Sequence, residues 1–367
     1  MSAAILGLAT AVPPHHYLQS EAADKFVQIL GIDEAKSSYI RQLYQNSAIH
    51  KRHSVLNDFN MERTEWNFWG QAFPQEIPGM QKRNEVYKKE APRLAYEAAQ
   101  KAIERWGGDP LTLTHIISIS CTGIVAPGIE FTLMPLLHLS PSINRFGINF
   151  MGCFGAFKGL SVAQAFAKEH PRNRILVVCT ELCSLHLQAN LDNETLIANS
   201  LFADGASAVV IGTDPQPFEN PLWEIANSHT MGLENSLDKM SWEAGDQGFL
   251  MRLSHTVPVY LGRSIKAFTD HLIPSSLKTD ECDWAIHPGG KSILQAIEKT
   301  MKLVPSQTEA AWKTLANYGN MSSATFLFVL EELAKQVNQQ KWAVGLAFGP
   351  GLSIEGVLLK RMEQVKR

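Results

Sequence analysis

One cysteine of this chain lies where a thiol could act as a nucleophile. The segment Met151-Gly152-Cys153-Phe154-Gly155 joins a predicted buried strand over 142–150 to an apolar helix predicted over 154–169. The thiolate is the reactive form of cysteine, and the N-terminus of a helix lowers the pKa of a thiol. A cysteine among alanine, phenylalanine and glycine can equally be a small buried hydrophobic residue. The local pattern therefore allows a nucleophile and a packing residue.

Two later segments carry polar side chains that could act with such a thiol. His287 stands where an apolar run, Trp284-Ala285-Ile286, ends in a turn, and Asn320 immediately precedes an apolar helix. Layered α/β proteins build their sites at strand ends and helix starts. Taken singly, His287 can be a structural histidine and Asn320 a helix cap or a turn residue.

These side chains must be positioned by a chain in which strand and helix patterns alternate, as is typical of layered α/β proteins. Short apolar runs predict strands over 3–10, 114–121, 142–150, 174–181, 206–212, 342–348 and 352–360. Apolar residues at helical spacing predict helices over 81–106, kinked or broken at Pro92, and over 154–169, 259–272, 291–303 and 324–336. The segment 57–80 is rich in Trp, Phe and Pro and has no clean period, which predicts a loop-rich cap on the surface.

The same pattern divides the chain into two halves. A chain of 367 residues is long enough for two domains or one duplicated unit. The β/α rhythm is similar on both sides of the proline-rich stretch Thr213-Asp214-Pro215-Gln216-Pro217. We therefore predict one half over 1–214, which carries Cys153, and a second over 218–367, which carries His287 and Asn320.

Composition and charge exclude several classes of function. Apolar residues make up 45% and charged residues 19% of the chain, which suits a compact soluble enzyme. A formal net charge of -3 and the lack of a basic cluster argue against a nucleic-acid partner. No apolar run reaches the roughly 18 residues of a membrane span. The first residues lack the positive charge of a signal peptide, so we expect none.

The cysteines indicate a reducing compartment. There are five, at widely spaced positions, and this odd number does not predict a disulfide framework. We therefore expect a cytoplasmic location. Cys179 and Cys183 are four positions apart with no matching second pair, so no zinc site is expected.

Five separated motifs resemble, in order and spacing, the type III polyketide synthases of the chalcone synthase superfamily. They are Gly152-Cys153-Phe154, Leu201-Phe202-Ala203-Asp204-Gly205-Ala206, Ile286-His287-Pro288-Gly289-Gly290, Tyr318-Gly319-Asn320-Met321-Ser322-Ser323-Ala324 and Phe348-Gly349-Pro350-Gly351-Leu352. The likeness covers nearly the whole chain. At 179–186 it is closer to the bacterial branch than to the plant enzymes.

The resemblance implies an α/β protein of the thiolase fold, with two αβαβα halves in a five-layered arrangement, normally a homodimer. It implies acyl-CoA and malonyl-CoA as substrates and neither a metal nor a cofactor. When the family's residue roles are transferred to this sequence, Cys153 receives the starter acyl group, and His287 pairs with its thiolate. His287 and Asn320 together hold the thioester oxygen of malonyl-CoA. A Cys–His ion pair keeps a thiolate populated near neutral pH, and imidazole and amide N–H groups suit a developing enolate oxygen.

The resemblance also assigns residues around the substrate. Phe202 matches one of two phenylalanines at the junction of tunnel and cavity, and Met251 replaces the other. Ala126 replaces a methionine that in plant enzymes reaches into the partner's cavity, and Trp242 replaces a cavity glycine. The whole predicted pocket comprises Cys121, Ala126, Cys183, His186, Phe202, Trp242, Met251 and Ser322. The basic residues of the plant tunnel mouth are missing at matching positions, so the predicted contacts to coenzyme A are Lys51, Arg52 and Lys291.

The predicted function is a synthase that extends a fatty acyl starter with malonyl-CoA to an alkylpyrone or alkylresorcinol. One alternative is a synthase that uses malonyl-CoA alone and makes tetrahydroxynaphthalene or phloroglucinol. Another is an initiating ketoacyl-acyl-carrier-protein synthase (type III), which shares the fold and the Cys-His-Asn set but adds a single unit. The last is a non-catalytic scaffold, whose signature would be a missing member of that set.

Overall fold

A computed structural model describes residues 2–337 and 340–362 of the chain, and its centre is a mixed β-sheet. The strand order is β11-β12-β13-β8-β1-β7-β6-β4-β5. Two hairpins, β2–β3 and β9–β10, lie outside this sheet. The strands are β1 Ala4–Ala11, β2 His15–Leu18, β3 Lys51–Ser54, β4 His115–Ser120, β5 Asn144–Asn149, β6 Arg174–Leu182, β7 Asp204–Gly212, β8 Trp223–Gly232, β9 Met240–Gly245, β10 Gly248–Leu253, β11 Cys282–Ile286, β12 Trp342–Gly349 and β13 Ser353–Arg361.

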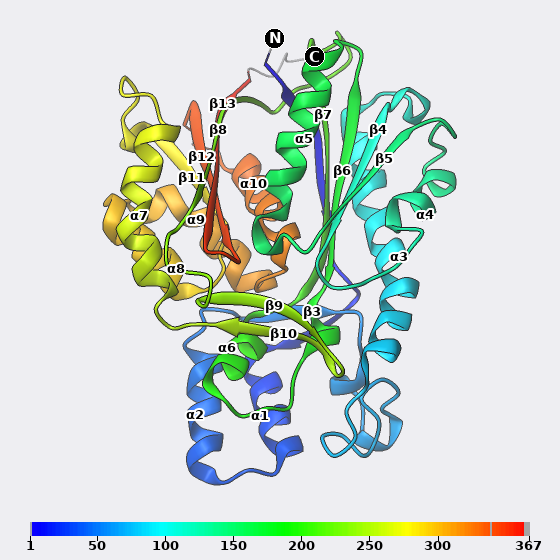
Figure 1. Ribbon diagram of the computed structural model, residues 1–367, viewed down its shortest axis with the longest axis vertical. Coiled ribbons are helices and arrows are strands. Elements are labelled where there is room, and N and C mark those ends of the chain that lie inside the picture. The colour runs from blue at the N-terminus through cyan, green and yellow to red at the C-terminus, as the bar shows by residue number, and fades with distance from the viewer. Residues whose placement is uncertain (1, 338–339, 363–367) are drawn as a thin grey trace.

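Helices cover both faces of this sheet in five layers (Figure 1). Helices α5 and α10 lie between its two halves, and α3 covers the outer face of β1, β6 and β7. On the opposite side α7 covers β8 and β13, and α8 packs against α7. The helices are α1 Gln19–Leu30, α2 Glu34–Gln45, α3 Met80–Trp106, α4 Ile129–Leu136, α5 Gly155–Glu169, α6 Asn193–Leu201, α7 Val257–Leu272, α8 Lys291–Met301, α9 Pro305–Tyr318 and α10 Thr325–Lys335. The predicted five-layered α/β arrangement is confirmed.

The two halves of the sheet meet at a short contact. Strand β1 pairs with β8 only through Ala4 with Glu224 and Ile5 with Trp223, whereas it pairs with β7 along its whole length. One continuous sheet therefore runs through both halves, and α5 and α10 fill the space that opens beyond this contact.

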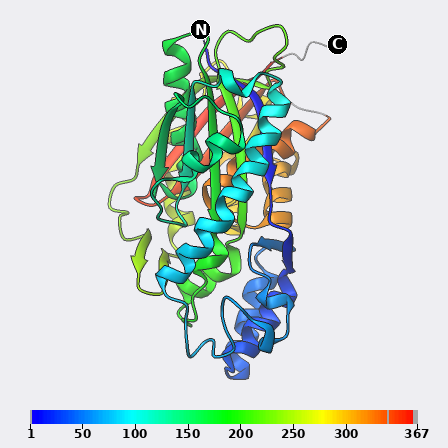
Figure 2. The same cartoon turned by 90° about the vertical axis from the view of Figure 1, so that its right-hand side faces the viewer.

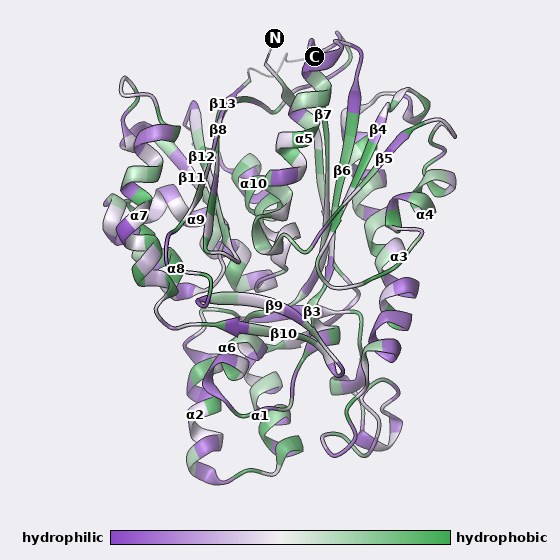
Figure 3. Cartoon of the chain, in the orientation of Figure 1, coloured by the Kyte–Doolittle hydropathy of each residue, from purple (hydrophilic) through white to green (hydrophobic). Residues whose placement is uncertain are grey.

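The central strands could be predicted from the sequence because they are buried. Strands β4, β6 and β7 are buried along their whole length, because helices cover both faces, and such strands have nearly continuous apolar runs. Figure 3 shows these runs in green along β4 and β6. Strand β5 forms where predicted but is largely exposed, so the prediction of a buried strand was wrong. It is the edge strand and has β4 as its neighbour on one side only.

The long helix α3 lies unusually close to β1. Pro92 is inside the helix, which continues through it, and Ala95, Ala98 and Ala102 are fully buried. A Cβ atom at Gly7 would lie 2.3 Å from the carbonyl oxygen of Ala102, so only glycine fits at this position. Small side chains on both elements thus permit the close helix–strand contact.

The segment 57–80 contains two 3-10 turns, Asp58–Asn60 and Arg63–Glu65, and no longer element. The prediction of a loop-rich segment is confirmed. Its placement on the surface was only partly right, because the aromatic side chains are buried: Trp66, Phe68, Trp69 and Phe73. Together with α1 and α2, the segment forms a lobe below the sheet, which Figure 2 shows in blue.

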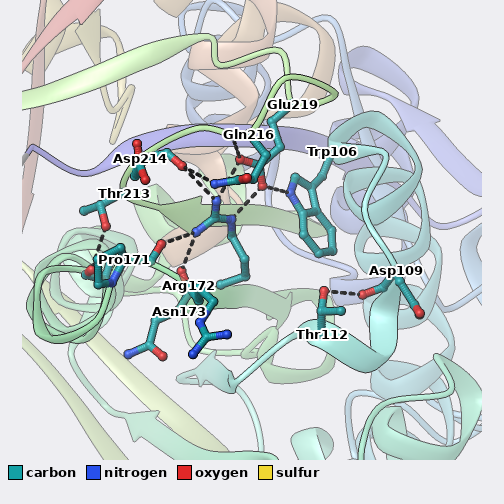
Figure 4. A network of polar contacts seen from close by, with 12 residues as sticks. Trp106, Asp109, Thr112, Pro171, Arg172, Asn173, Thr213, Asp214, Gln216 and Glu219 are labelled. Carbon is teal, nitrogen blue, oxygen red and sulfur yellow. Dashed lines mark hydrogen bonds and ion pairs between the residues drawn. The ribbon is translucent and has the colours of Figure 1, made fainter.

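A buried ion pair holds the connection between the two halves (Figure 4). Glu219 accepts hydrogen bonds at 2.6 and 2.8 Å from Nε and Nη2 of Arg174, at 2.6 Å from the indole of Trp106 and at 2.7 Å from the backbone of Gln216. Both charged side chains are almost fully buried. Burial alone would raise the pKa of Glu219, but these hydrogen bonds outweigh it and hold the pKa below its ordinary value.

We expect Glu219→Gln to lower the free energy of unfolding by about 3 to 5 kcal/mol, because it leaves the Arg174 charge buried without its partner. Urea unfolding measures this loss. Since the folded-state pKa of Glu219 is depressed, its contribution is complete above the unfolded pKa and is lost as the pH falls through the folded value. The difference between wild type and variant should therefore shrink in acid.

Glu309→Gln is the matched control, since its ion pair with Lys313 is about half exposed on both sides. Such pairs contribute roughly 0 to 1 kcal/mol. Equal unfolding midpoints for the two variants would contradict the role given to Glu219.

Candidate active site

The parallel strands of both halves end at one place, and the reactive side chains follow directly after them. Cys121 follows β4 and Cys183 follows β6, whereas Cys153 comes shortly after β5. In the other half, His287 follows β11. Parallel strands β4, β5 and β6 share one carboxyl edge, as do β11 and β12. A site at such an edge is the common arrangement in α/β proteins.

The thiol lies in a single 3-10 turn, Gly152–Phe154, that leads directly into α5. Cys153 is 6% exposed. Gly152 has a φ of +72°, and a Cβ atom there would lie 2.5 Å from Cδ of Pro350. Glycine is therefore required before the cysteine, both for the backbone conformation and for the close approach of the loop after β12.

The carboxamide of Asn320 lies beside this thiol. Its Oδ1 is 3.9 Å and its Nδ2 4.0 Å from Sγ of Cys153. Oδ1 accepts a hydrogen bond from the backbone of Ser322, and Nδ2 donates to the carbonyl of Gly289 at 3.2 Å. These bonds fix the orientation of the amide so that its second N–H faces the thiol of Cys153.

The imidazole of His287 is buried and has no hydrogen-bond partner among the described residues. Its exposure is 1%, and neither Nδ1 nor Nε2 makes a hydrogen bond there. The backbone N–H donates to Leu346 at 2.7 Å, which anchors the residue to β12. Buried polar atoms normally have partners, so the two free nitrogens indicate a group that a ligand must satisfy.

Burial acts against a charge on either of the two groups. It raises the pKa of Cys153 to about 11, although hydrogen bonds from Ser322 and Asn320 oppose the shift. Burial also lowers the pKa of His287 to about 3. No hydrogen bond joins the two side chains among the described residues. The thiolate–imidazolium pair that the resemblance implies therefore stays a prediction.

A small cavity of about 340 Å³ opens at the thiol. Its lining contains most of the predicted pocket: Cys121, Cys183, Phe202, Trp242, Met251 and Ser322, together with Cys153. Thr122, Met240 and Pro350 also line it and were not predicted.

A second, larger cavity of about 890 Å³, partly open to solvent, adjoins the first. Its lining is mainly apolar and reaches α1, α2 and the segment 57–80 through residues that include Phe26, Tyr44, Leu56, Phe59 and Trp69. The two cavities share Cys183, Phe202, Trp242 and Met251. These four side chains form a partition, which is the name we give them below.

Trp242 is fixed within the partition by its indole N–H, which donates to the carbonyl of Cys121 at 2.7 Å. Its ring centroid is 6.5 Å from that of Phe202. Met251 pairs directly with Trp242 in the β9–β10 hairpin. The hairpin therefore supplies two of the four side chains that separate the cavities.

His186 lines the larger cavity as a structural residue. Its Nδ1 accepts a hydrogen bond from the backbone N–H of Phe249 at 3.1 Å, so Nε2 carries the proton and donates to Thr122 at 2.8 Å. Both ring nitrogens are thus occupied. Burial lowers the pKa of His186 to about 3, which keeps the ring neutral.

Arg52 is held by acceptors of the chain itself. Its Nε donates to the side chain of Gln19 at 2.8 Å, and Nη1 donates to the carbonyls of Asn199 and Phe202 at 2.7 and 2.8 Å. The side chain therefore holds the end of α6 and Phe202 of the partition. Its contact to coenzyme A stays a prediction.

Two other predicted groups lie apart from the thiol cavity. Lys51 in β3 and Lys291 at the start of α8 are half-buried. Ala126 lines surface cavities between α3 and α4 and neither of the two cavities at the partition. Within one chain it therefore adds nothing to the pocket, as expected of a position assigned to the partner's cavity.

Glu181 is the main residue that the sequence analysis missed. It is fully buried near the end of β6, and its carboxylate accepts hydrogen bonds from Cys121 and Thr122 at 2.9 Å each. A lone carboxylate in an otherwise apolar strand was the available signal, since buried charges need compensation.

Two further findings concern the described residues as a whole. No group of three or more His, Cys, Asp or Glu side chains among them is arranged to hold a metal ion. No helix within the described ranges has the length and apolar character of a membrane span.

Comparison with known proteins agrees with this architecture. The C-terminal type III polyketide synthase domain of Steely1, a type I/III hybrid from Dictyostelium, superposes with a TM-score of 0.93 at 34% identity, over 99% of this chain and 100% of that one. PKS-I from the brown alga Ectocarpus siliculosus has a TM-score of 0.91 at 27% identity, over 98% of both chains. The fold is therefore the thiolase fold of type III polyketide synthases, as predicted.

Family models assign the chain directly. The N-terminal domain of chalcone and stilbene synthases matches residues 1–215, and the C-terminal domain matches 225–363. The chain belongs to the chalcone and stilbene synthase family. It is also 34% identical over 365 residues to "Probable polyketide synthase 1" of Dictyostelium discoideum, of which it spans only 11%. These relatives come from Dictyostelium and a brown alga, so closeness to the bacterial branch has no support here.

Proposed function

We propose that the protein is a type III polyketide synthase that loads an acyl-CoA starter, a fatty acyl chain, on Cys153 and extends it with malonyl-CoA to an alkylpyrone or alkylresorcinol. The observation that carries this proposal is the apolar cavity of about 890 Å³ that adjoins the thiol cavity at the partition. A long apolar chain attached to Cys153 would gain free energy by burial there, at roughly 0.8 kcal/mol for each methylene group.

The first step is acyl transfer to the thiol. Cys153 gives its proton to the free imidazole of His287, and the thiolate attacks the thioester carbonyl of the starter. The coenzyme A thiolate leaves and takes the proton back from the imidazolium.

The second step is decarboxylation of malonyl-CoA. Carbon dioxide leaves, and the negative charge moves to the thioester oxygen as an enolate. The donors are an N–H of His287 and the N–H of Asn320 that faces the thiol, and each such donor lowers a barrier by about 3 kcal/mol. The enolate carbon then attacks the acyl-Cys153 thioester, which expels Cys153 as a thiolate and leaves the extended chain on coenzyme A.

A synthase that uses malonyl-CoA alone is the second candidate, and the size of the thiol cavity favours it. If the partition stays closed, the group on Cys153 has only the small cavity that Cys121, Cys153 and Ser322 help to line. That space suits a short polyketide better than a fatty chain.

A graded series of acyl-CoA starters distinguishes the two candidates. Each starter is incubated with the protein and malonyl-CoA, and the products are identified by mass spectrometry. We expect products that contain the starter and a preference for long chains, because the larger cavity is apolar. An aromatic product from malonyl-CoA alone, with no starter incorporated, would reject the fatty starter and support the second candidate.

Two variants of Trp242 sharpen this experiment. Trp242→Ala removes the indole that separates the cavities and should broaden the range of starters, whereas Trp242→Phe keeps an aromatic ring and loses only the bond to Cys121. Unchanged chain-length preference in Trp242→Ala would argue against the route through the partition.

The proposal includes a cytoplasmic homodimer that acts on soluble coenzyme A thioesters. All five cysteines are free, which suits a reducing compartment. The edge strand β5 and helix α4 expose a group of large apolar side chains that a second copy would cover: Phe131, Leu136, Phe146, Phe150 and Met151. Lys51 and Lys291 remain the proposed contacts to the phosphates of coenzyme A.

A further inference from the structure

The β9–β10 hairpin carries Trp242 and Met251 of the partition but does not belong to the central sheet. Its two strands pair only with each other, and Figure 1 shows them crossing the lower end of that sheet. The turn that joins the two strands, with the first residues of β10, forms the tip of the hairpin, residues 246–249. A two-stranded hairpin is marginally stable in water when it stands alone. The position of the partition therefore depends on the contacts that the hairpin makes with the elements around it.

The side chain of Gln188, which is buried, holds the tip of the hairpin. Its Nε2 donates to the carbonyls of Gln247 at 3.1 Å and Phe249 at 3.4 Å. It also donates to the carbonyl of His186 at 3.1 Å. The backbone of Gln188 is fixed to α6, because the amide of Asn199 donates to its carbonyl at 2.7 Å and accepts from its N–H at 3.3 Å. One residue thus connects the hairpin tip with a helix.

Helix α3 supports the same tip through its first turn. The backbone N–H of Met80 donates to the carbonyl of Asp246 at 2.8 Å. Gly248 lies against the side chain of Arg83, since a Cβ atom at this glycine would lie 3.0 Å from Cδ, Nε and Cζ of the arginine. Gly248 has a φ of +105°, a conformation that glycine adopts without strain. The tip and the arginine therefore fit closely together.

Arg83 is a fully buried cation whose hydrogen-bond acceptors among the described residues are backbone carbonyls. Its Nε donates to Pro78 at 2.8 Å, and Nη1 donates to Leu185 and, at 3.3 Å, to Leu187. Nη2 has no partner in the described part of the chain. Its Cζ lies 5.3 Å from the ring centroid of Trp69, which lines the larger cavity. A buried charge without a carboxylate partner is costly, so packing alone does not account for this arginine.

We propose that Arg83 and Gln188 are positioning residues that form a latch: they hold the hairpin tip and thereby set how long an acyl chain Cys153 accepts. Neither residue lines the thiol cavity, so both act through the hairpin. A long chain on Cys153 must displace the hairpin against the bonds of the latch to reach the larger cavity, whereas a short group stays in the thiol cavity. This inference deepens the proposed function and rests on its route through the partition.

Alkylation of Cys153 by maleimides of different length tests the latch. The rates with N-ethylmaleimide and N-dodecylmaleimide are followed by mass spectrometry of the Cys153 peptide. The ratio of the long to the short reagent cancels any change in the reactivity of the thiol itself. Gln188→Leu keeps the size of the side chain and removes its donors, so the ratio should rise by roughly five- to tenfold, the effect of one or two neutral hydrogen bonds. Arg83→Lys, which keeps the charge but not the planar set of donors, should raise the ratio as well.

Gln307→Leu is the matched control. The amide of Gln307 also donates to two backbone carbonyls, those of Thr279 and Cys282 at 2.9 Å each, but it lies in α9 and binds no part of the hairpin. This variant loses the same kind of bond and should keep the wild-type ratio. A rise equal to that of Gln188→Leu would assign the effect to general loosening of the fold and overturn the latch.

A double variant tests whether the latch acts through the partition. Trp242→Ala removes the indole that separates the cavities and should raise the ratio alone, and Gln188→Leu should then add little to it. A wild-type ratio in Gln188→Leu, or fully additive effects in the double variant, would overturn the proposal. Alkylation needs neither an acyl-CoA nor malonyl-CoA. A raised ratio in a protein that makes no polyketide would therefore reject the proposed function and support the latch.

Discussion

Replacing Cys153 with alanine should abolish polyketide formation, with a loss of about 10⁴-fold or more in turnover. In the proposed mechanism the starter is attached to this thiol, and no other thiol of the described residues hydrogen-bonds the Asn320 carboxamide. Product formation from acyl-CoA and malonyl-CoA measures the loss. Intact mass spectrometry after incubation with starter alone should show one acyl group on the wild type and none on Cys153→Ala.

Cys282→Ala is the matched control for this variant. Cys282 is also a free, fully buried cysteine, but it begins β11 and lines neither of the two cavities at the partition. Its replacement should leave turnover nearly unchanged. An acyl adduct on Cys153→Ala, or product formed at the wild-type rate, would refute the mechanism.

Asn320→Ala should separate the two half-reactions. In the proposed mechanism the amide donates to the enolate oxygen, so its removal should slow decarboxylation of malonyl-CoA by about 10²- to 10³-fold. Acyl transfer to Cys153 should continue, because it depends on His287 as the proton acceptor. Release of carbon dioxide from malonyl-CoA and the mass of the acylated protein report the two steps independently.

His287→Ala should slow both steps, since the proposed mechanism has the imidazole take the thiol proton and also donate to the enolate. Asn317→Ala is the control for the asparagine variant, because Asn317 is exposed at the end of α9 and bonds only to Lys313 of the same helix. Equal losses in decarboxylation and acylation for Asn320→Ala would contradict the separate role of the amide.

The sequence predicted the central strands and helices because buried elements have recognisable patterns of apolar residues. Strands β1, β4, β6 and β7 have continuous apolar runs, and α5 and α10 keep an apolar helical period. Helices α1 and α2, the hairpin of β9 and β10 and strand β8 were not predicted. They lie in a half-exposed lobe or present mixed surfaces, where polar and apolar residues follow no simple period.

The sequence predicted which residues form the site, but it did not predict the pKa shifts of their side chains. Motif order gave Cys153, His287 and Asn320, and the partition residues followed from the family resemblance. The direction of the thiol and imidazole pKa shifts depends on how completely three distant segments exclude water, which no local pattern encodes. Arg52 and Glu181 show the same limit, because their partners are backbone groups far away in the sequence.

The position of β1 has a consequence for synthesis of the chain on the ribosome. Of the strands in the central sheet, β1 comes first along the chain, yet its two neighbours are β7 and β8, which begin at Asp204 and Trp223. A buried apolar segment must therefore stay unpaired while the residues up to β7 are made. Nascent chains that stop before β7 would present this strand to the chaperones that bind exposed hydrophobic segments.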